Sequence, residues 1–170
     1  PRADTTQNPE DKTAVGVPTG EKLKGYFDDD WKRDVVIAVK TKEGKGNPEE
    51  GGKPDEFALL FPGGQLPSVT VGCCEFRLIN EGDLNDDDCD EISIFQAPLN
   101  GCTYLLKTYS FQNGRWKQLM GPFLVPTGCE YLSDEELQKR IVKEPYGVYY
   151  YFTYPNDKPW ELSKKRVDIE

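Results

Sequence analysis

Residues 82–94 carry oxygen-bearing side chains at alternate positions, a spacing that suits a bound metal ion. A hard cation such as Ca²⁺ takes roughly six to eight oxygen ligands, often from one flexible loop. Alternate side chains on a tightly turned chain can converge on one point, and a backbone carbonyl between them can add another oxygen. The sequence therefore predicts a structural calcium site with these ligands: Asp83, Asn85, Asp87, the carbonyl of Cys89, and Glu91.

The same segment also fits a solvated acidic turn between two strands, with no metal ion. Its closely spaced carboxylates repel one another unless a cation or water screens them. It is not an EF-hand loop, because that loop needs glycine at its sixth position, where Asp88 stands. Leu84 is expected to anchor the turn, and Ile92 and Ile94 to begin a strand with period-two alternation.

The acidic segment occurs twice, because residues 25–37 align without gaps with residues 82–94. An interval of about fifty residues is typical of propeller blades and similar units. The first copy has Tyr26 where the second has Asp83, so we predict that a single metal ion would choose the second copy. Lys32 and Arg33 are candidates to neutralise the first copy. The matched pairs are Phe27 and Leu84, Asp28 and Asn85, Asp30 and Asp87, and Asp34 and Glu91.

At these residues the chain resembles the FG-GAP/VCBS type of repeat, found in integrin-like propellers and many secreted bacterial proteins. Residues 82–92 look like that family's calcium loop, and residues 25–37 look like a degenerate copy. The family pattern usually has glycine after the third acidic ligand, where this chain has Trp31 and Asp88. The resemblance implies β-sheet repeats with structural calcium, and it implies no particular reaction.

Composition favours one acidic domain that does not bind nucleic acid. The chain has 170 residues and a formal net charge of −9, which argues against nucleic acid and anionic lipid as partners. Its apolar runs are too short to span a bilayer. We expect a flexible leader at 1–19 and one β-rich domain at 20–170. Within it we expect repeat units at about 20–76 and 77–125, then a helix and strand at 126–170.

The predicted fold is mainly β, with antiparallel sheets built from two FG-GAP-like units and one short helix at about 133–143. Residues 35–39 are continuously apolar and predict a central strand. Asn113-Gly114 predicts a hairpin, and Ser133 with Glu136 predicts a capping box at the start of the helix. A propeller needs roughly four blades or more, so two units predict an open or sandwiched assembly, not a closed propeller.

Catalysis has little support in the sequence. The chain has no histidine, which excludes Ser-His-Asp and Cys-His catalysis and histidine-bound metals. A carboxylate pair could serve a glycosidase, but among thirty acidic residues some pair always looks suitable. We therefore predict that the protein is not an enzyme and has no catalytic residues. A hydrolase that uses a carboxylate pair stays as a third hypothesis, after the two binding functions given at the end of this subsection.

Five cysteines leave at least one unpaired within a monomer. Cys73 and Cys74 would point to opposite faces of an extended strand, so we expect them not to pair with each other. Two readings stay open for the set: buried thiols, or one or two disulfides formed in an oxidising compartment. The other three are Cys89, Cys102 and Cys129.

Aromatic residues near the C-terminus offer a surface for a partner. Alternation along a strand sends Tyr149 and Tyr151 to the face opposite Tyr150. One set is expected in the core, and Tyr149, Tyr151 and Trp160 are the residues we expect at a partner surface. Exposed aromatic rings stack on sugars and anchor protein interfaces.

The leading expectation is an exported, non-catalytic binding protein with one structural calcium ion, in the periplasm or on the cell surface. Its partner would be a protein or a glycan, and a lipid anchor upstream of the chain fits the polar leader. The alternative is a small acidic inhibitor or immunity-type protein that caps an enzyme and holds no metal. Binding to glycans would favour the first, and co-purification with a basic enzyme the second.

Overall fold

The computed structural model describes residues 16–154, 156, 158 and 161–169. They form a mainly β protein with one short α-helix and one 3₁₀ turn, η1 (Pro48–Glu50). The strands and helix are β1 (Val17–Gly25), β2 (Asp34–Lys42), β3 (Glu56–Leu60), β4 (Val69–Gly72), β5 (Phe76–Gly82), β6 (Glu91–Gln96), β7 (Thr103–Gln112), β8 (Arg115–Pro126), α1 (Asp134–Gln138), β9 (Ile141–Glu144), β10 (Gly147–Phe152) and β11 (Ser163–Val167).

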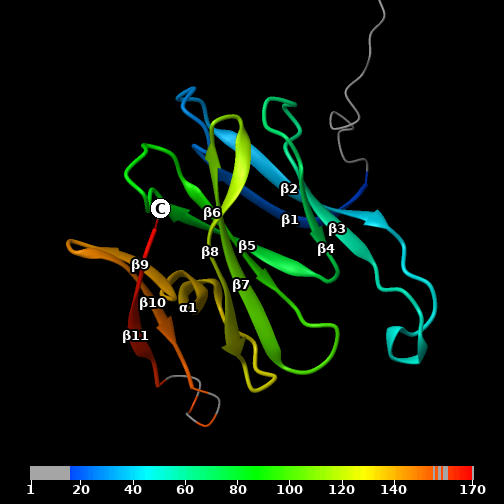
Figure 1. The fold of residues 1–170 in the computed structure, drawn as a ribbon. Helices are drawn as coiled ribbons and strands as arrows, with labels where there is room; N and C mark the ends of the chain where they lie inside the picture. Colours follow the sequence, from blue (N-terminus) through cyan, green and yellow to red (C-terminus); the bar gives the residue numbers. More distant parts are fainter. Residues whose placement is uncertain (1–15, 155, 157, 159–160, 170) are drawn as a thin grey trace, which may run out of the picture.

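The strands build three antiparallel sheets (Figure 1). The first sheet has the order β1-β2-β3-β4 and the second β5-β6-β7-β8, so both follow the chain. The third has the order β11-β10-β9. None of the sheets described closes into a barrel or propeller, and the predicted fold class is confirmed.

The first two sheets are built alike around their acidic loops. In each, the loop joins the first strand to the second, and it starts and ends at a paired position: Gly25 with Asp34, and Gly82 with Glu91. We call residues 25–34 the first acidic loop and residues 82–91 the second. The two sheets meet along β1 and β5, where the Leu78 backbone N–H donates to Oε1 of Glu21 (2.8 Å).

Two separate cores hold the three sheets in a stack. The first core lies between the first and second sheets and includes Phe27, Val36, Leu59, Leu78 and Ile94. The second core lies between the second sheet and the third sheet with α1, and includes Leu84, Phe95, Leu106, Leu137 and Tyr150. Alternate side chains of β6 enter different cores, as expected for a strand covered on both faces.

Local signals in the sequence produce the expected structures. β2 lies between β1 and β3, and Val36, Ala38 and Val39 are buried. Asn113 and Gly114 both have positive φ in the turn between β7 and β8, and Phe111 pairs with Trp116 across that hairpin. Left-handed backbone at both turn residues is what such a short hairpin requires.

The helix has the predicted capping box but ends at Gln138, earlier than the predicted 143. The Ser133 hydroxyl accepts from the Glu136 N–H (3.2 Å), and the Glu136 carboxylate accepts from the Ser133 N–H (2.6 Å). Beyond the helix, Ile141–Glu144 pairs with β10. Backbone pairing with a neighbouring strand therefore overrides the helical pattern in this stretch.

The first strand begins inside the predicted leader. β1 starts at Val17, which pairs with Lys40 of β2. Pairing with a neighbouring strand gives this stretch backbone partners that its sequence does not reveal. Residues 1–15 and Trp160 lie outside the described residues.

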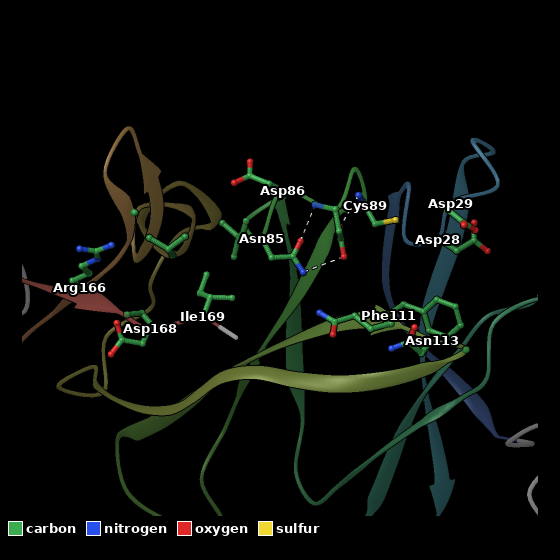
Figure 2. A pocket seen from close by; sticks show the side chains of 17 residues that line it. Asp28, Asp29, Asn85, Asp86, Cys89, Phe111, Asn113, Arg166, Asp168 and Ile169 are labelled. Atoms are coloured by element: carbon green, nitrogen blue, oxygen red, sulfur yellow. Dashed lines mark hydrogen bonds between the residues drawn. The ribbon is translucent and has the colours of Figure 1, made fainter.

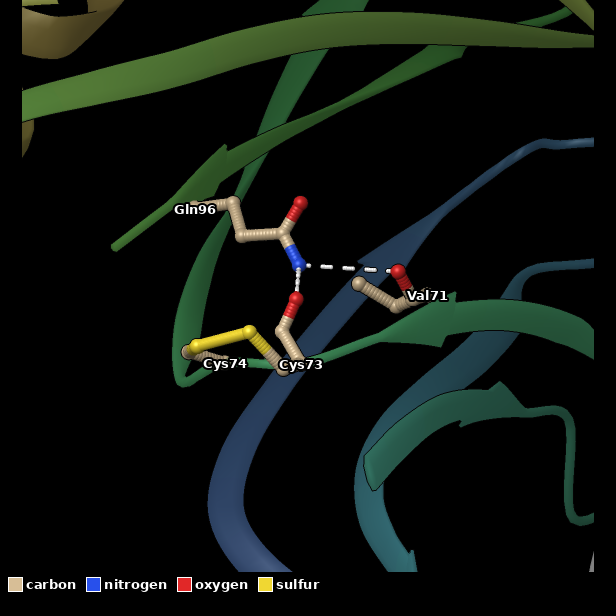
Figure 3. Close-up of a disulfide and its surroundings, with 4 residues drawn as sticks. All are labelled: Val71, Cys73, Cys74 and Gln96. Atoms are coloured by element: carbon tan, nitrogen blue, oxygen red, sulfur yellow. Dashed lines mark hydrogen bonds between the residues drawn. A yellow bond between two sulfur atoms is a disulfide. The ribbon is translucent and has the colours of Figure 1, made fainter. Parts of the chain in front are cut away.

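Four of the five cysteines form two disulfides, and Cys89 is a buried free thiol. Cys102 pairs with Cys129, and Cys73 pairs with its neighbour Cys74 (Figure 3). The prediction that Cys73 and Cys74 do not pair is wrong, because it assumed an extended strand. They lie in the bend between β4 and β5, where the Gln96 side-chain amide donates to the Cys73 carbonyl.

In the part of the chain that the structure describes, no helix has the length and apolar character needed to cross a membrane.

Candidate metal loop and adjoining cleft

The second acidic loop folds its side chains onto its own backbone. The Asp87 N–H donates to Oδ1 of Asn85 (3.2 Å), and the Cys89 N–H donates to Oδ1 of Asp87 (2.9 Å). Oδ2 of Asp83 accepts from the Asp88 N–H (2.9 Å). Short polar side chains that bond to backbone two residues ahead form turns of this kind. The predicted side chains Asp83, Asn85 and Asp87 therefore gather around one tight turn.

Glu91 closes the loop from inside the protein. The Leu84 N–H donates to its Oε2 (2.6 Å), and Leu84 itself is buried in the second core. The Glu91 side chain is completely buried, and its Oε1 has no hydrogen-bond partner. Burial raises the pKa of Glu91 to about 7, and Asp87 and Asp83 add to the rise. An unpartnered buried carboxylate oxygen calls for a ligand or a proton.

Cys89, the fifth predicted ligand, is buried, and burial raises the pKa of its thiol to about 11. A neutral thiol is a poor ligand for a hard cation. Only its backbone carbonyl, as predicted, suits that role.

The first acidic loop repeats the same hydrogen bonds. The Asp30 N–H donates to Asp28 (3.0 Å), the Lys32 N–H to Asp30 (2.7 Å), and the Phe27 N–H to Asp34 (3.0 Å). Trp31 and Asp88 occupy equivalent positions with φ of 59° and 65°. The two segments therefore share this hydrogen-bond pattern, although Asp86 has positive φ and its counterpart Asp29 does not.

The first loop draws its carboxylates together more tightly than its sequence suggests. One oxygen each of Asp28, Asp30 and Asp34 lies within 4.8 Å of the others. Burial, followed by neighbouring carboxylates, raises the pKa of Asp28 and of Asp34. Sequence reasoning placed the better metal site in the second copy, and it did not foresee this convergence in the first.

Positive charge reaches the second loop and not the first. Among the described residues, Lys32 and Arg33 form no ion pair, so the suggestion that they neutralise the first loop finds no contact to support it. Lys143 of β9 instead places Nζ 2.5 Å from Oδ1 of Asp86 and 2.9 Å from the Asp83 carbonyl. Asp86 raises the pKa of Lys143. This ammonium braces the outside of the second loop.

The two loops are joined to each other by their backbones. The Tyr26 N–H donates to Oδ2 of Asp90 (2.9 Å), and the Asp90 N–H donates to the Tyr26 carbonyl (2.7 Å). Asn80 Nδ2 donates to the same Asp90 oxygen (3.1 Å). A conformational change in one loop would therefore alter hydrogen bonds that the other loop makes.

A cleft of about 860 Å³ lies beside the second loop (Figure 2). Figure 2 shows Asn85 and Asp86 on one side, Phe111 and Asn113 of the β7–β8 hairpin on another, and Asp168 and Ile169 near the C-terminus. The apolar members of its lining are Leu84, Phe111, Val148, Val167 and Ile169. The charged members are Asp28, Asp29, Asp86, Asp87, Arg166 and Asp168. An apolar wall with a few polar groups is typical of ligand sites.

The predicted aromatic surface lies on the outer face of the third sheet. Tyr149 and Tyr151 are half-buried there, with Nζ of Lys164 4.0 Å from the Tyr149 ring centroid and the Tyr151 hydroxyl donating to Glu144 (2.7 Å). Tyr150 points the other way into the second core, as the alternation predicts. These local contacts leave Tyr149 and Tyr151 less free than a bare aromatic patch.

Sequence reasoning missed Glu81, Asp90 and Lys143. Glu81 and Asp90 flank the ligand pattern and carry no spacing signal of their own. Lys143 comes from a separate sheet. Only Lys143 is brought to the second loop by the tertiary fold, because Asp90 lies within the loop and Glu81 directly before it.

The chain matches no known family model, no curated protein and no solved structure.

Proposed function

We propose that the protein is an exported, non-catalytic binding protein whose second acidic loop holds a structural calcium ion. The observation that carries the proposal is Glu91, a fully buried carboxylate with one oxygen unpartnered at the base of a turn of carboxylate and amide oxygens. The resemblance to the FG-GAP/VCBS type of repeat points the same way. The ion would be held by Asp83, Asn85, Asp87, the Cys89 carbonyl and Glu91.

The donor set fits calcium by its chemistry. All five predicted ligands offer oxygen, the donor that hard cations prefer. Three of them carry negative charge, and the only ammonium on the second loop, among the described residues, contacts Asp86 and the outer side of Asp83. When bound, the ion would neutralise the carboxylates and stabilise the turn between β5 and β6.

Export is supported by the two disulfides. Disulfides persist in oxidising compartments and are rare in the reducing cytosol. Calcium loops of low affinity are also useful only where calcium is abundant, outside the cytosol. The proposed location is therefore the periplasm or the cell surface.

The partner, a protein or a glycan, would bind in the cleft beside the second loop. The cleft joins apolar side chains to four loop carboxylates, Asp28, Asp29, Asp86 and Asp87. Its acidity also favours the alternative, an inhibitor that caps a basic enzyme without needing a metal. An Asp29→Lys variant, with Glu50→Lys as a charge-matched control far from the cleft, should weaken capture of a glycan or a basic enzyme only in the first variant.

The calcium proposal is tested by thermal unfolding in calcium and in EDTA. A ligand at about a hundred times its dissociation constant adds about 2.7 kcal/mol to stability. Calcium should raise the midpoint of the wild type by several degrees and leave Asp87→Ala unchanged. Asp29→Ala, an exposed aspartate of the first loop, is the control and should keep the shift. No shift in the wild type would reject the site and favour the inhibitor.

A further inference from the structure

Beneath the second acidic loop, a buried group of polar side chains interrupts the second core. It lies on the face of the second sheet that packs against α1 and the third sheet. Ser93 pairs with Thr108 across β6 and β7, and Glu91 lies two residues before Ser93 on the same face. The remaining members are Glu81 on β5 and Ser110 on β7. The rest of this face is apolar, including Ile79, Phe95 and Leu106.

Three carboxylate oxygens of this group are buried and have no hydrogen-bond partner: both oxygens of Glu81 and Oε1 of Glu91. The hydroxyls have other partners as well, and Ser110 Oγ only accepts, so its own proton is free to donate. Ser93 Oγ and Thr108 Oγ1 lie 2.7 Å apart, and Ser110 Oγ accepts from the side-chain amides of Asn85 and Gln112 (3.2 Å each).

No cationic side chain among the described residues contacts these two carboxylates. Lys143 is the nearest candidate by position, and it bonds Asp86 and the Asp83 carbonyl instead. Arg140 is buried close to the third sheet, where its guanidinium donates to the Tyr151 carbonyl (3.5 Å). A buried carboxylate without a counter-charge is strongly unfavourable, so two neighbouring ones call for protons or for a bound cation.

We propose that Glu81 and the free oxygen of Glu91 bind a second divalent cation, at a buried position beneath the second acidic loop. This inference rests on the proposed function, because Glu91 also belongs to the loop site. It adds a ligand from β5 that lies outside the acidic repeat pattern. Glu81 interacts electrostatically with Glu91 and lies on the buried face of the second sheet, whereas Asp87 is exposed, so the inner position differs from the outer one. Glu91 would bridge the two ions, and Glu81 would also act as a supporting group for the loop site.

The experiment counts bound calcium by equilibrium dialysis against CaCl₂ and measures the unfolding midpoint in EDTA. The wild type should bind two ions, Glu81→Gln and Asp87→Ala should each bind one, and Glu91→Gln should bind none tightly. Glu50→Gln, an exposed glutamate in η1, is the control and should bind two. The affinity of the remaining ion in Glu81→Gln should be roughly tenfold weaker, in the range seen when a supporting group of a metal site is removed.

Stability in EDTA separates loss of a ligand from loss of the fold. Without calcium, Glu81→Gln removes a buried carboxyl group that folding must protonate or leave charged, so its midpoint at neutral pH should equal or exceed that of the wild type. In calcium the order should reverse. A damaged fold would instead lower the midpoint in both conditions, and would overturn the assignment.

The outcomes also separate this inference from the loop site. One ion in the wild type, lost in Asp87→Ala and retained in Glu81→Gln, would overturn the inner position and leave the loop site intact. Two ions in both the wild type and Glu81→Gln would also overturn it. No bound calcium in the wild type would reject both sites together.

Discussion

The two acidic loops share their main hydrogen bonds and differ in what lies beneath them. In each, a backbone N–H at the apolar anchor bonds the closing carboxylate, Asp34 or Glu91. The anchor of the first loop, Phe27, packs in the first core, and the anchor of the second, Leu84, packs in the second core. The same kind of turn therefore packs its apolar anchor into two different cores.

The difference at the closing carboxylate shows what one methylene does. Asp34 is half-buried and lies close to Asp28 and Asp30, and all three side chains are partly exposed to solvent. Glu91 reaches further and is fully buried, with Glu81 as its acidic neighbour. The backbone of the turn tolerates either residue. The residue at this position decides where the negative charge lies: close to solvent in the first loop, and among buried groups in the second.

The largest expected effect comes from the two anchors. Phe27→Ala should lower the free energy of unfolding by about 4 kcal/mol and Leu84→Ala by about 3 kcal/mol, because each leaves a cavity in its core. Chemical denaturation in EDTA measures both. Equal losses smaller than about 1 kcal/mol would mean that the anchors do not seal the cores.

A second prediction tries to erase the difference between the loops. Tyr26→Asp supplies the first loop with the carboxylate that the second has at Asp83. In an Asp87→Ala background, calcium should then stabilise the protein again by about 1–2 kcal/mol at saturating concentration. The midpoint of thermal unfolding, with and without EDTA, reports this. Tyr26→Asn in the same background is the control, and it should give a smaller shift.

A third prediction uses pH without calcium. Burial raises the pKa of Glu81 to about 8, from a usual value of 4.5. Between those pH values the folded state holds a proton that the unfolded state has lost, so stability falls as pH rises. In EDTA the free energy of unfolding should increase by roughly 3 kcal/mol from pH 8 to pH 5, because one extra proton in the folded state changes it by about 1.4 kcal/mol per pH unit.

Glu81→Gln should make that pH dependence shallower, since its amide does not titrate, and Glu91, whose pKa is also raised, should supply what remains. Urea denaturation at several pH values measures the slope. An equally steep slope in the variant would assign the effect to other groups. The first loop offers no matched buried pair, so Asp30→Asn should change the slope little.

The smallest expected effect concerns the left-handed residues at equivalent positions, Trp31 and Asp88. A bulky side chain is disfavoured at φ of 59°, and glycine is not. Trp31→Gly should stabilise the protein by about 1 kcal/mol, and Asp88→Gly by less, because aspartate tolerates this region better. Thermal melts in EDTA give both values, and Asn113→Gly serves as a third left-handed site for reference.

Features fixed by neighbouring residues were predictable from the sequence. The turn at Asn113-Gly114, the capping box of Ser133 and the equivalence of the two acidic loops depend on spacing within a few residues. The mainly β fold followed from the same signals. Interactions between distant segments were not predictable: Lys143 reaches the second loop from β9, and the burial of both Glu81 carboxylate oxygens depends on the tertiary fold.

The pairing of Cys73 with Cys74 shows where a prediction from local sequence rules fails. The argument from alternation was sound for a strand, but a bend between β4 and β5 removes its premise. Helix length failed for a similar reason, since Ile141 and Val142 found strand partners on β10. Local rules hold until the backbone has a better partner elsewhere.

Because the three sheets are stacked, the second acidic loop connects all three of them. It grows from the middle sheet, bonds the first sheet through Asp90 and Tyr26, and bonds the third through Lys143. Among the described residues none belongs to both cores, so apart from this loop each outer sheet can open while the other stays packed, as in proteins whose units contact only their neighbours. Weakening the contacts that the second loop makes with both outer sheets would therefore raise amide exchange in β1 and β9 together, although these strands lie on opposite sides of the stack.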